Sequence, residues 1–300
     1  MDGEYTRSDL ACEALSGEDT KIAGAERSER AVNGIVIQRL CVRSADASKA
    51  LQKPMGTYLT LHCGNVAQLS EEKMRVLCYL LTGELRGIAE KLTGKCINAD
   101  FSVLVVGLGN AELTADAIGP KTISKLTATR HLRKHERELY YAVGCASLSA
   151  LAPGVLGQTG MESAELLRQV VRVVQPDLLI AIDSLAARSC ARLSSTIQIS
   201  DVGIAPGSGV GNHRARISKE TVGVPVLGLG IPTVVNSATL VYDALREAGI
   251  ENADQSLRQV LQTGKSFFVS PKDSDLVCER ASDLLSKVIS MAFLGKLESL

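Results

Sequence analysis

The stretch SVLVVGLGNAELTADAIGP, residues 102–120, contains the pattern that decides the fold. Residues 102–106 form a continuous apolar run, rich in β-branched side chains, that is typical of a strand buried on both faces of a sheet. Gly107-Leu108-Gly109 follows directly and predicts a tight turn, and residues 116–132 have the pattern of a helix. A strand, a turn and a helix in this order predict one unit of an α/β protein.

The same alternation continues along the chain. We expect strands at 32–42, 58–63, 142–151, 178–182, 196–200 and 224–229, and helices at 70–92, 116–132, 161–174, 236–248 and 272–294. This order predicts a mainly parallel, twisted sheet with helices on both faces and additional N-terminal strands. We divide the chain into an acidic N-terminal arm (1–31) and a single α/β domain (32–300), which comprises an N-terminal extension (32–100), a core (101–250) and a C-terminal helical part (251–300).

Composition restricts the partners and the compartment. The 300 residues include 33 Lys+Arg and 33 Asp+Glu, so the formal net charge is zero. Binding to nucleic acid or to an anionic membrane requires a basic excess, and we expect neither partner. The terminus MDGEYTRSD lacks the basic start and apolar stretch of a signal peptide, and the eight cysteines show no paired spacing. We therefore expect a cytoplasmic protein.

Two aspartates stand where α/β proteins place their chemistry, beyond the carboxyl ends of strands. Asp116 falls at the start of a predicted helix, where capping is the simpler interpretation of this residue taken alone. Asp183 follows the aliphatic run LLIAI (178–182), and burial of a carboxylate there would raise its pKa. A functional role for Asp183 is favoured slightly over a structural one, either an ion pair with Arg188 or capping of the turn that follows.

Three glycine-rich segments and a histidine pair match no strong motif. Segment 105–112 lacks the third glycine of a dinucleotide fingerprint, and segment 196–214 fits neither a phosphate-binding loop nor a nucleophile elbow. The latter is equally consistent with a cleft-lining loop and a simple connection, and segment 228–240 is expected to be another glycine-rich loop after a strand. His131 and His135 are four residues apart, but their charge-rich surroundings favour a solvated helix face over a metal site.

Taken together, the motifs closely resemble the spore germination protease family of spore-forming Firmicutes, whose members degrade small acid-soluble spore proteins. The segments that carry the resemblance are VVGLGN (105–110), TADAIGP (114–120), TRHL (129–132), SALAPGVLGQTGMES (149–163), PDLLIAIDSLAARS (176–189), TIQISDVGIAPGSGVGN (196–212), SKETVGVPVLGLGIPTVV (218–235) and VSPKD (269–273).

The resemblance implies a fold similar to that of hydrogenase maturation endopeptidases and an atypical aspartic-type endopeptidase with no cofactor and no metal. By motif, its two catalytic aspartates fall on Asp116 and Asp183. It also implies a homotetramer in the spore core. The residues expected to shape the cleft are Gly107, Gly109, Asn110, Arg188, Gly207, Ser208, Gly209, Gly211 and Asn212.

The resemblance further implies a zymogen. YTRSDLACEA (5–14) is similar to the family's propeptide processing region and to the cleavage motif of its substrates, a small residue followed by an acid. We expect autoprocessing near Glu13. The processing region comprises Asp9, Leu10, Ala11, Cys12 and Glu13.

Hydrolysis by two carboxylates requires one ionised and one protonated group. The helix dipole favours an anionic Asp116 as the base, and desolvation favours a neutral Asp183 as the acid. Two alternatives remain at this point. One is a metal-dependent endopeptidase of the hydrogenase-maturation type, and the other is a non-enzymatic ligand-binding α/β protein.

Overall fold

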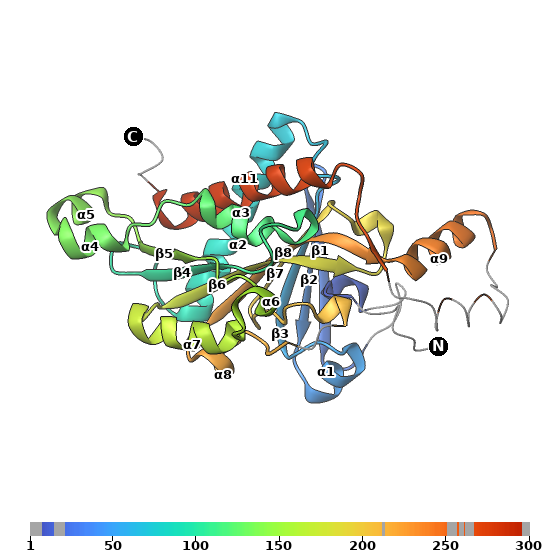
Figure 1. The fold of residues 1–300 in the computed structure, drawn as a ribbon, viewed down its shortest axis with the longest axis horizontal. Coiled ribbons are helices and arrows are strands. Elements are labelled where there is room, and N and C mark those ends of the chain that lie inside the picture. The colour runs from blue at the N-terminus through green and yellow to red at the C-terminus, as the bar shows by residue number, and fades with distance from the viewer. Residues whose placement is uncertain are drawn as a thin grey trace.

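The computed structural model describes residues 8–14, 22–211, 214–250, 257, 261 and 267–295. Within these residues, one sheet runs through the molecule (Figure 1). Its strands are β1 (Ala25–Val32), β2 (Ile35–Val42), β3 (Gly56–His62), β4 (Ser102–Gly107), β5 (Ser147–Leu151), β6 (Leu178–Ala187), β7 (Thr196–Ser200), β8 (Val226–Asn236) and β9 (Phe268–Val269).

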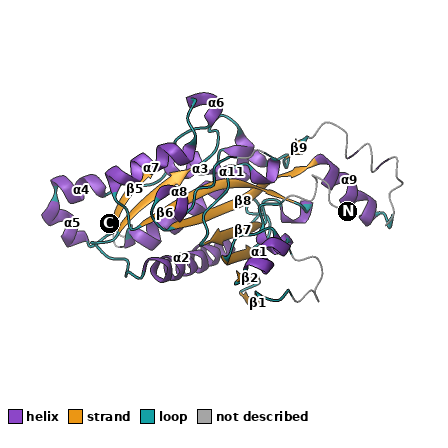
Figure 2. Ribbon diagram, turned by 90° about the horizontal axis from the view of Figure 1, so that it is seen from below, coloured by secondary structure: helices purple, strands orange, loops and turns teal. Residues whose placement is uncertain are grey.

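The strand order is β1-β2-β3-β7-β8-β6-β4-β5, with β9 paired to β8. Figure 2 shows the strands side by side, with β1 at the rim of the sheet. Parallel pairing joins β5, β4, β6 and β8, and the other neighbours pair antiparallel. The predicted α/β class is confirmed, and its parallel part is the region where strands and helices alternate in the sequence.

Helices cover both faces of this sheet (Figure 1). They are α1 (Ala45–Leu51), α2 (Glu71–Thr93), α3 (Ile118–Ser124), α4 (Arg130–His135), α5 (Arg137–Val143), α6 (Leu156–Thr159), α7 (Ser163–Val174), α8 (Lys219–Val222), α9 (Ser237–Glu247) and α11 (Ser274–Phe293). Short 3-10 turns are η2 (Ala11–Glu13), η3 (Thr114–Asp116), η4 (Cys190–Arg192) and η5 (Ser208–Val210). In the described part of the chain, no helix is both long and apolar enough to cross a bilayer.

The central strands of the sheet have continuous apolar sequences because helices cover both of their faces. In β6, Ile180 and Ile182 pack with α2, α3 and α11 on one face, while Leu179 and Ala181 pack with α7 and α8 on the other. Burial of each isoleucine and leucine side chain contributes roughly 1.5–3 kcal/mol. Since helices cover both faces there, residues 178–182 are apolar on both faces of the strand.

The predicted helix at 116–132 is wrong in its extent, because it breaks into η3, α3 and α4. Thr129, between α3 and α4, is fully buried and bonds to the start of β5. Its hydroxyl donates to the carbonyl of Ala146 at 2.7 Å and accepts from the N–H of Leu148 at 2.9 Å. These tertiary bonds take residue 129 out of the helical path. The predicted strand at 142–151 is similarly shortened, since α5 continues to Val143 and β5 begins at Ser147.

Two central strands are longer than their sequences suggested. β6 continues to Ala187, and β8 continues to Asn236, so the glycine-rich loop expected at 228–240 is largely strand. The two strands pair along almost their whole length. Glycine is required at position 230 for this close pairing. Any other residue would place its Cβ only 2.7 Å from the carbonyl oxygen of Asp183.

The sheet begins inside the segment that we expected as the N-terminal arm. Residues 25–32 form β1, which joins β2 through the two-residue turn Asn33-Gly34, with φ values of 51° and 75°. Such a turn is typical of a tight hairpin. β1 has the polar composition of an arm because its central residues are all exposed at the edge of the sheet.

Candidate active site

Asp116 and Asp183 line the same cavity, which has a volume of about 570 Å³. Asp183 belongs to β6, where the preceding residue, Ile182, is the last to pair with β4. Asp183 itself pairs only with Gly230 of β8. The sequence predicts that Asp183 follows the end of its strand, but Asp183 lies within β6. It lies directly beyond the carboxyl end of the neighbouring strand β4, where an open sheet leaves a crevice.

Asp116 is held in η3 by the turn that follows β4. Its carboxylate accepts the main-chain N–H of Asn110 at 2.7 Å. Gly109 has a φ of 106°, and a Cβ there would lie 2.0 Å from the main-chain oxygen of Asp116 and 2.8 Å from its carboxylate. Only glycine therefore allows this turn to approach Asp116 so closely. The capping interpretation is wrong, because Ala117 occupies the N-cap of α3 and no side chain caps that helix.

The two carboxyl groups differ in environment. Asp183 is only 5% exposed, and its burial raises its pKa well above the usual range. The charges of Asp116 and Asp9 raise it further, against a smaller lowering by the N–H of Ser184. Burial also raises the pKa of Asp116, but the N–H of Asn110 opposes this effect. Asp183 is thus the carboxyl group that favours the protonated form.

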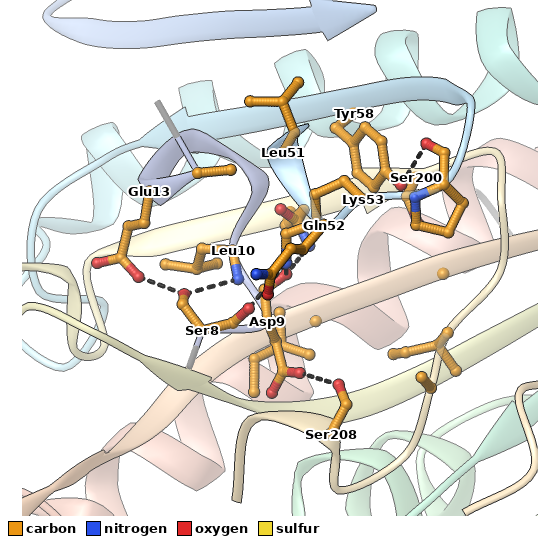
Figure 3. A pocket seen from close by; sticks show the side chains of 18 of the residues that line it. Ser8, Asp9, Leu10, Glu13, Leu51, Gln52, Lys53, Tyr58, Ser200 and Ser208 are labelled. Carbon is orange, nitrogen blue, oxygen red and sulfur yellow. Dashed lines mark hydrogen bonds between the residues drawn. The ribbon is translucent and has the colours of Figure 1, made fainter. Parts of the chain in front are cut away.

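An N-terminal segment, residues 8–14, lies against the sheet. Its residues Ser8, Asp9, Leu10 and Glu13 line a second, neighbouring cavity of about 540 Å³ (Figure 3). The main chain of Asp9 bonds to β6, its N–H donating to the carbonyl of Ala186 at 3.0 Å. In return, the N–H of Ala186 donates to the Asp9 carboxylate at 2.9 Å, and the hydroxyl of Ser208 donates to the other carboxylate oxygen. Asp9 also lines the cavity that holds both aspartates.

The second acidic residue of this segment is bound in the same way. The Glu13 carboxylate accepts the main-chain N–H groups of Arg188 at 2.8 Å and of Ser189 at 3.0 Å, together with the hydroxyl of Ser8. The guanidinium of Arg188 donates to the main-chain oxygen of Glu13 at 2.6 Å. Arg188 therefore holds the segment and is not the ion-pair partner of Asp183 that the alternative interpretation required.

Leu10 and Ala11, between the two acids, are fully buried. Leu10 packs with Leu185, Ala187 and Val235. The N–H of Ala11 donates to the side-chain oxygen of Gln198 at 2.6 Å. The segment is therefore docked by apolar contact as well as by its charges.

The main-chain oxygen of Asp9 accepts two side-chain donors that the sequence analysis missed. Lys53 Nζ and Gln198 Nε2 each lie 3.1 Å from this oxygen, and Lys53 also bonds to the main-chain oxygen of Ser8 at 2.8 Å. Burial lowers the pKa of Lys53, while Asp9 and Glu13 raise it. Gln198 could have been suspected as the only amide in the apolar run TIQIS, but nothing in the sequence around Lys53 indicates its role.

The predicted cleft residues are divided by the structure. Gly109, Asn110 and Gly207 line the cavity, and Arg188 and Ser208 contact the N-terminal segment. Gly209 lies under Asp9, where a Cβ would be 2.5 Å from the Asp9 carboxylate.

Gly107 and Gly211 line neither cavity within the described residues. Gly107 is packed beneath α3, where a Cβ would lie 2.3 Å from the carbonyl oxygen of Gly119, and Gly211 ends η5. Asn212 lies outside the described residues.

The described residues contain no group of three or more His, Cys, Asp or Glu side chains placed to hold a metal ion. His131 and His135 are exposed on α4, as expected for a solvated helix face. All eight cysteines are free thiols.

The amino-acid sequence was compared with known protein families and with individual proteins. A family model described as germination protease matches residues 8–267, a range that includes the N-terminal segment and both aspartates. A germination protease of Caldanaerobacter subterraneus subsp. tengcongensis is 36% identical over 309 residues, covering 95% of this chain and 93% of the relative. The chain belongs to the germination protease family. It is therefore a protease, and the expected resemblance is confirmed.

Further germination proteases align over most of their length. The relative from Clostridium acetobutylicum is 36% identical over 97% of this chain and 96% of its own, and that from Priestia megaterium is 38% identical over 87% and 73%. Among solved structures, a NiFe hydrogenase maturation protease, HycI from Thermococcus kodakarensis KOD1, covers 64% of this chain and 94% of its own. The two chains are 15% identical, and the TM-score is 0.33. Family membership favours a peptidase over the ligand-binding alternative.

Proposed function

We propose that this germination protease is an endopeptidase in which Asp116 and Asp183 form the catalytic pair. The observation that carries this proposal is that both carboxyl groups line one cavity and that the charge of Asp116 raises the pKa of Asp183. Because the charge of one acid raises the pKa of the other, Asp183 retains its proton at a pH where Asp116 is ionised. Peptide hydrolysis by two carboxyl groups needs that combination.

In this mechanism, the ionised Asp116 accepts a proton from water as the water oxygen attacks the carbonyl carbon of the substrate. Asp183 donates its proton to the carbonyl oxygen or, when the C–N bond breaks, to the leaving amine. The assignment rests on burial, because Asp183 is the more buried of the two. Each carboxylate accepts one main-chain N–H, from Asn110 or from Ser184, but only the pKa of Asp183 is raised well above its usual range. General acid–base catalysis of this type contributes typically 10²–10⁴-fold.

We propose small acid-soluble spore proteins as the substrates, hydrolysed in the spore core during germination. The groove that holds residues 8–14 supports an acidic substrate. Main-chain N–H groups of β6 and of the residues after it receive the carboxylates of Asp9 and Glu13. Such hydrogen bonds to an anion are stronger than those between neutral groups. A substrate strand with two acids at this spacing would make the same contacts.

We propose that the chain is made as a zymogen and that residues 8–14 include its processing site. Of this segment, only Asp9 lines the cavity of the two aspartates, whereas Glu13 lines the neighbouring cavity. This arrangement favours a cut beside Asp9 over the position near Glu13 that we expected. The main-chain oxygen of Asp9, with donors from Lys53 and Gln198, suits the peptide bond that follows Asp9, because donors on a carbonyl stabilise the oxyanion formed during attack. By the family resemblance, we also propose a homotetramer.

The test is cleavage of a purified small acid-soluble spore protein by Asp116→Asn and Asp183→Asn chains, prepared with residues 1–9 removed so that processing is not required. Each variant should lose at least about 10²-fold in rate while retaining the circular dichroism of the parent chain. Asp46→Asn, an exposed aspartate of α1, is the matched control and should cleave normally. Near-normal cleavage by either catalytic variant would exclude the paired-aspartate mechanism.

A further inference from the structure

β1 leaves an open edge at the rim of the sheet (Figure 2). In the described part of the chain, β2 is the only strand that pairs with β1, and residues 26–31 are all exposed. An unpaired strand edge offers its main-chain N–H and C=O groups to another strand. At eight residues, this edge is long enough to template a full strand pair.

The β1–β2 hairpin determines which residues face outward. Because the turn has two residues, Val32 and Ile35 form a hydrogen-bonded pair, and every second residue before Val32 directs its main-chain groups toward β2. The alternate residues direct their N–H and C=O groups away from the sheet. These are Ala25, Arg27, Glu29 and Ala31.

The charges of β1 are self-complementary in one antiparallel register. Residues 25–31 read AERSERA. When two copies pair antiparallel about Ser28, Glu26 lies opposite Arg30 and Arg27 lies opposite Glu29, each pair occurring twice. In the same register, Arg27 and Glu29 are both outward-facing, so they also form hydrogen-bonded backbone pairs.

Neighbouring registers lose this match. A two-fold centred on Arg27 or on Glu29 preserves the backbone bonding but places like charges directly opposite each other, which is destabilising. Registers centred between residues set an outward-facing residue against an inward-facing one and lose the hydrogen bonds. Within one chain, Arg27 and Glu29 form an ion pair at 3.5 Å, and their side chains are 40% and 51% exposed. In the paired register, each exchanges this partner for the oppositely charged residue of the second copy.

We propose that β1 pairs with β1 of a second copy of this chain, antiparallel and centred on Ser28, so that the two sheets become one continuous sheet. The contact is isologous, since the same residues contribute from both chains, as in most two-fold protein interfaces. Charged edge strands usually prevent association. Here the order of the charges opposes other registers and selects this one. The interface does not depend on the proposed peptidase mechanism.

The experiment compares the masses of full-length chains in solution by analytical ultracentrifugation. Arg27→Glu places two carboxylates opposite each other twice across the interface, and Glu29→Arg does the same with two cations. Each single variant should have half the mass of the wild-type assembly. An equimolar mixture of the two variants should regain the wild-type mass, because opposite charges again face each other. The double variant Arg27→Glu/Glu29→Arg should regain it alone.

Two results would overturn this interface. One is an unchanged mass for both single variants. The other is a loss of mass that neither the mixture nor the double variant reverses, because that pattern would report damage to the strand and not its charge register. Circular dichroism of each variant, matched to the wild-type spectrum, verifies that the hairpin is folded.

Discussion

The Asp9 carboxylate accepts the main-chain N–H of Ala186 at 2.9 Å, on the same strand that carries Asp183. A residue far away in sequence thus brings a third carboxylate into the cavity of the two candidate catalytic aspartates. Its charge is one of the causes that raise the pKa of Asp183. The N-terminal segment therefore affects both the shape of the site and its protonation.

The first prediction concerns stability against pH. Because the pKa of Asp183 in the folded chain lies above its value of about 4 in an unfolded chain, the folded state binds this proton more tightly. The free energy of unfolding should then fall as the pH rises from about 4 through the folded-state pKa. Asp183→Asn removes the titrating group, so its unfolding free energy should exceed that of the wild type progressively above about pH 4.

Urea unfolding of both chains across a pH series measures this difference. Asp116→Asn is the comparison, and its effect should have the same sign but be smaller, since Asp116 accepts the N–H of Asn110 and is less buried. Parallel pH profiles for the wild type and Asp183→Asn would contradict a raised pKa at Asp183.

The second prediction concerns docking of the N-terminal segment. Glu13→Gln replaces an anion that accepts two main-chain N–H groups, and hydrogen bonds to charged groups contribute about 1.5–3 kcal/mol. Release of residues 8–14 should become roughly 10- to 100-fold more populated. Amide hydrogen exchange at Ala11, whose N–H is bonded to Gln198, measures that population. Glu72→Gln on the exposed face of α2 should leave exchange at Ala11 unchanged, and equal protection in both variants would show that Glu13 does not hold the segment.

Local patterns in the sequence were sufficient for much of the fold. β7 occupies its predicted residues, and α2 begins after Ser70, whose hydroxyl accepts the N–H of Lys73. Periodicity and caps act within a few residues, so they can be read directly. Asp183 could also be singled out, because a carboxyl group directly after a run of aliphatic residues is conspicuous. Asp116 is identified only through the family resemblance, since its position alone favours capping.

What the sequence could not show depends on contacts between distant residues. Thr129 interrupts a helix by bonding to β5, and Gly230 stays in a strand because β6 pairs with it. Lys53, in the loop after α1, and Gln198, in β7, both bond to the main-chain oxygen of Asp9. The polar strand β1 could not be told from an arm, because the hydrogen bonds that order it are made by its backbone.

The third prediction concerns the close packing of η5 on β6. A Cβ on Gly209 would lie 2.5 Å from the Asp9 carboxylate and 2.6 Å from Cβ of Ala186, and the latter belongs to a strand that cannot move aside. Gly209→Ala should therefore destabilise the chain by about 1–3 kcal/mol and weaken the bond between Ser208 and Asp9. Gly157→Ala in α6, with no atom within 4 Å of the new Cβ, is the matched control and should be neutral or slightly stabilising. The measurement is the urea concentration at half-unfolding of each variant. Equal values for Gly209→Ala and Gly157→Ala would mean that η5 shifts to accommodate the new methyl group.

The fourth prediction tests the donors to the main-chain oxygen of Asp9. If the bond after Asp9 is the one that is cut, Lys53→Met removes a donor to the developing oxyanion and should slow processing by about 10²–10³-fold. Gln198→Leu should slow processing by a comparable factor. It also removes the acceptor of the Ala11 N–H, so amide exchange at Ala11 should rise in this variant. That rise distinguishes loss of docking from loss of the oxyanion donor. Lys49→Met, an exposed lysine of α1, should process at the wild-type rate. Mass spectrometry of the chain over time gives both the rate and the bond. Unchanged rates in Lys53→Met and Gln198→Leu, or a product that begins at a residue other than Leu10, would show that these donors serve only to dock the segment.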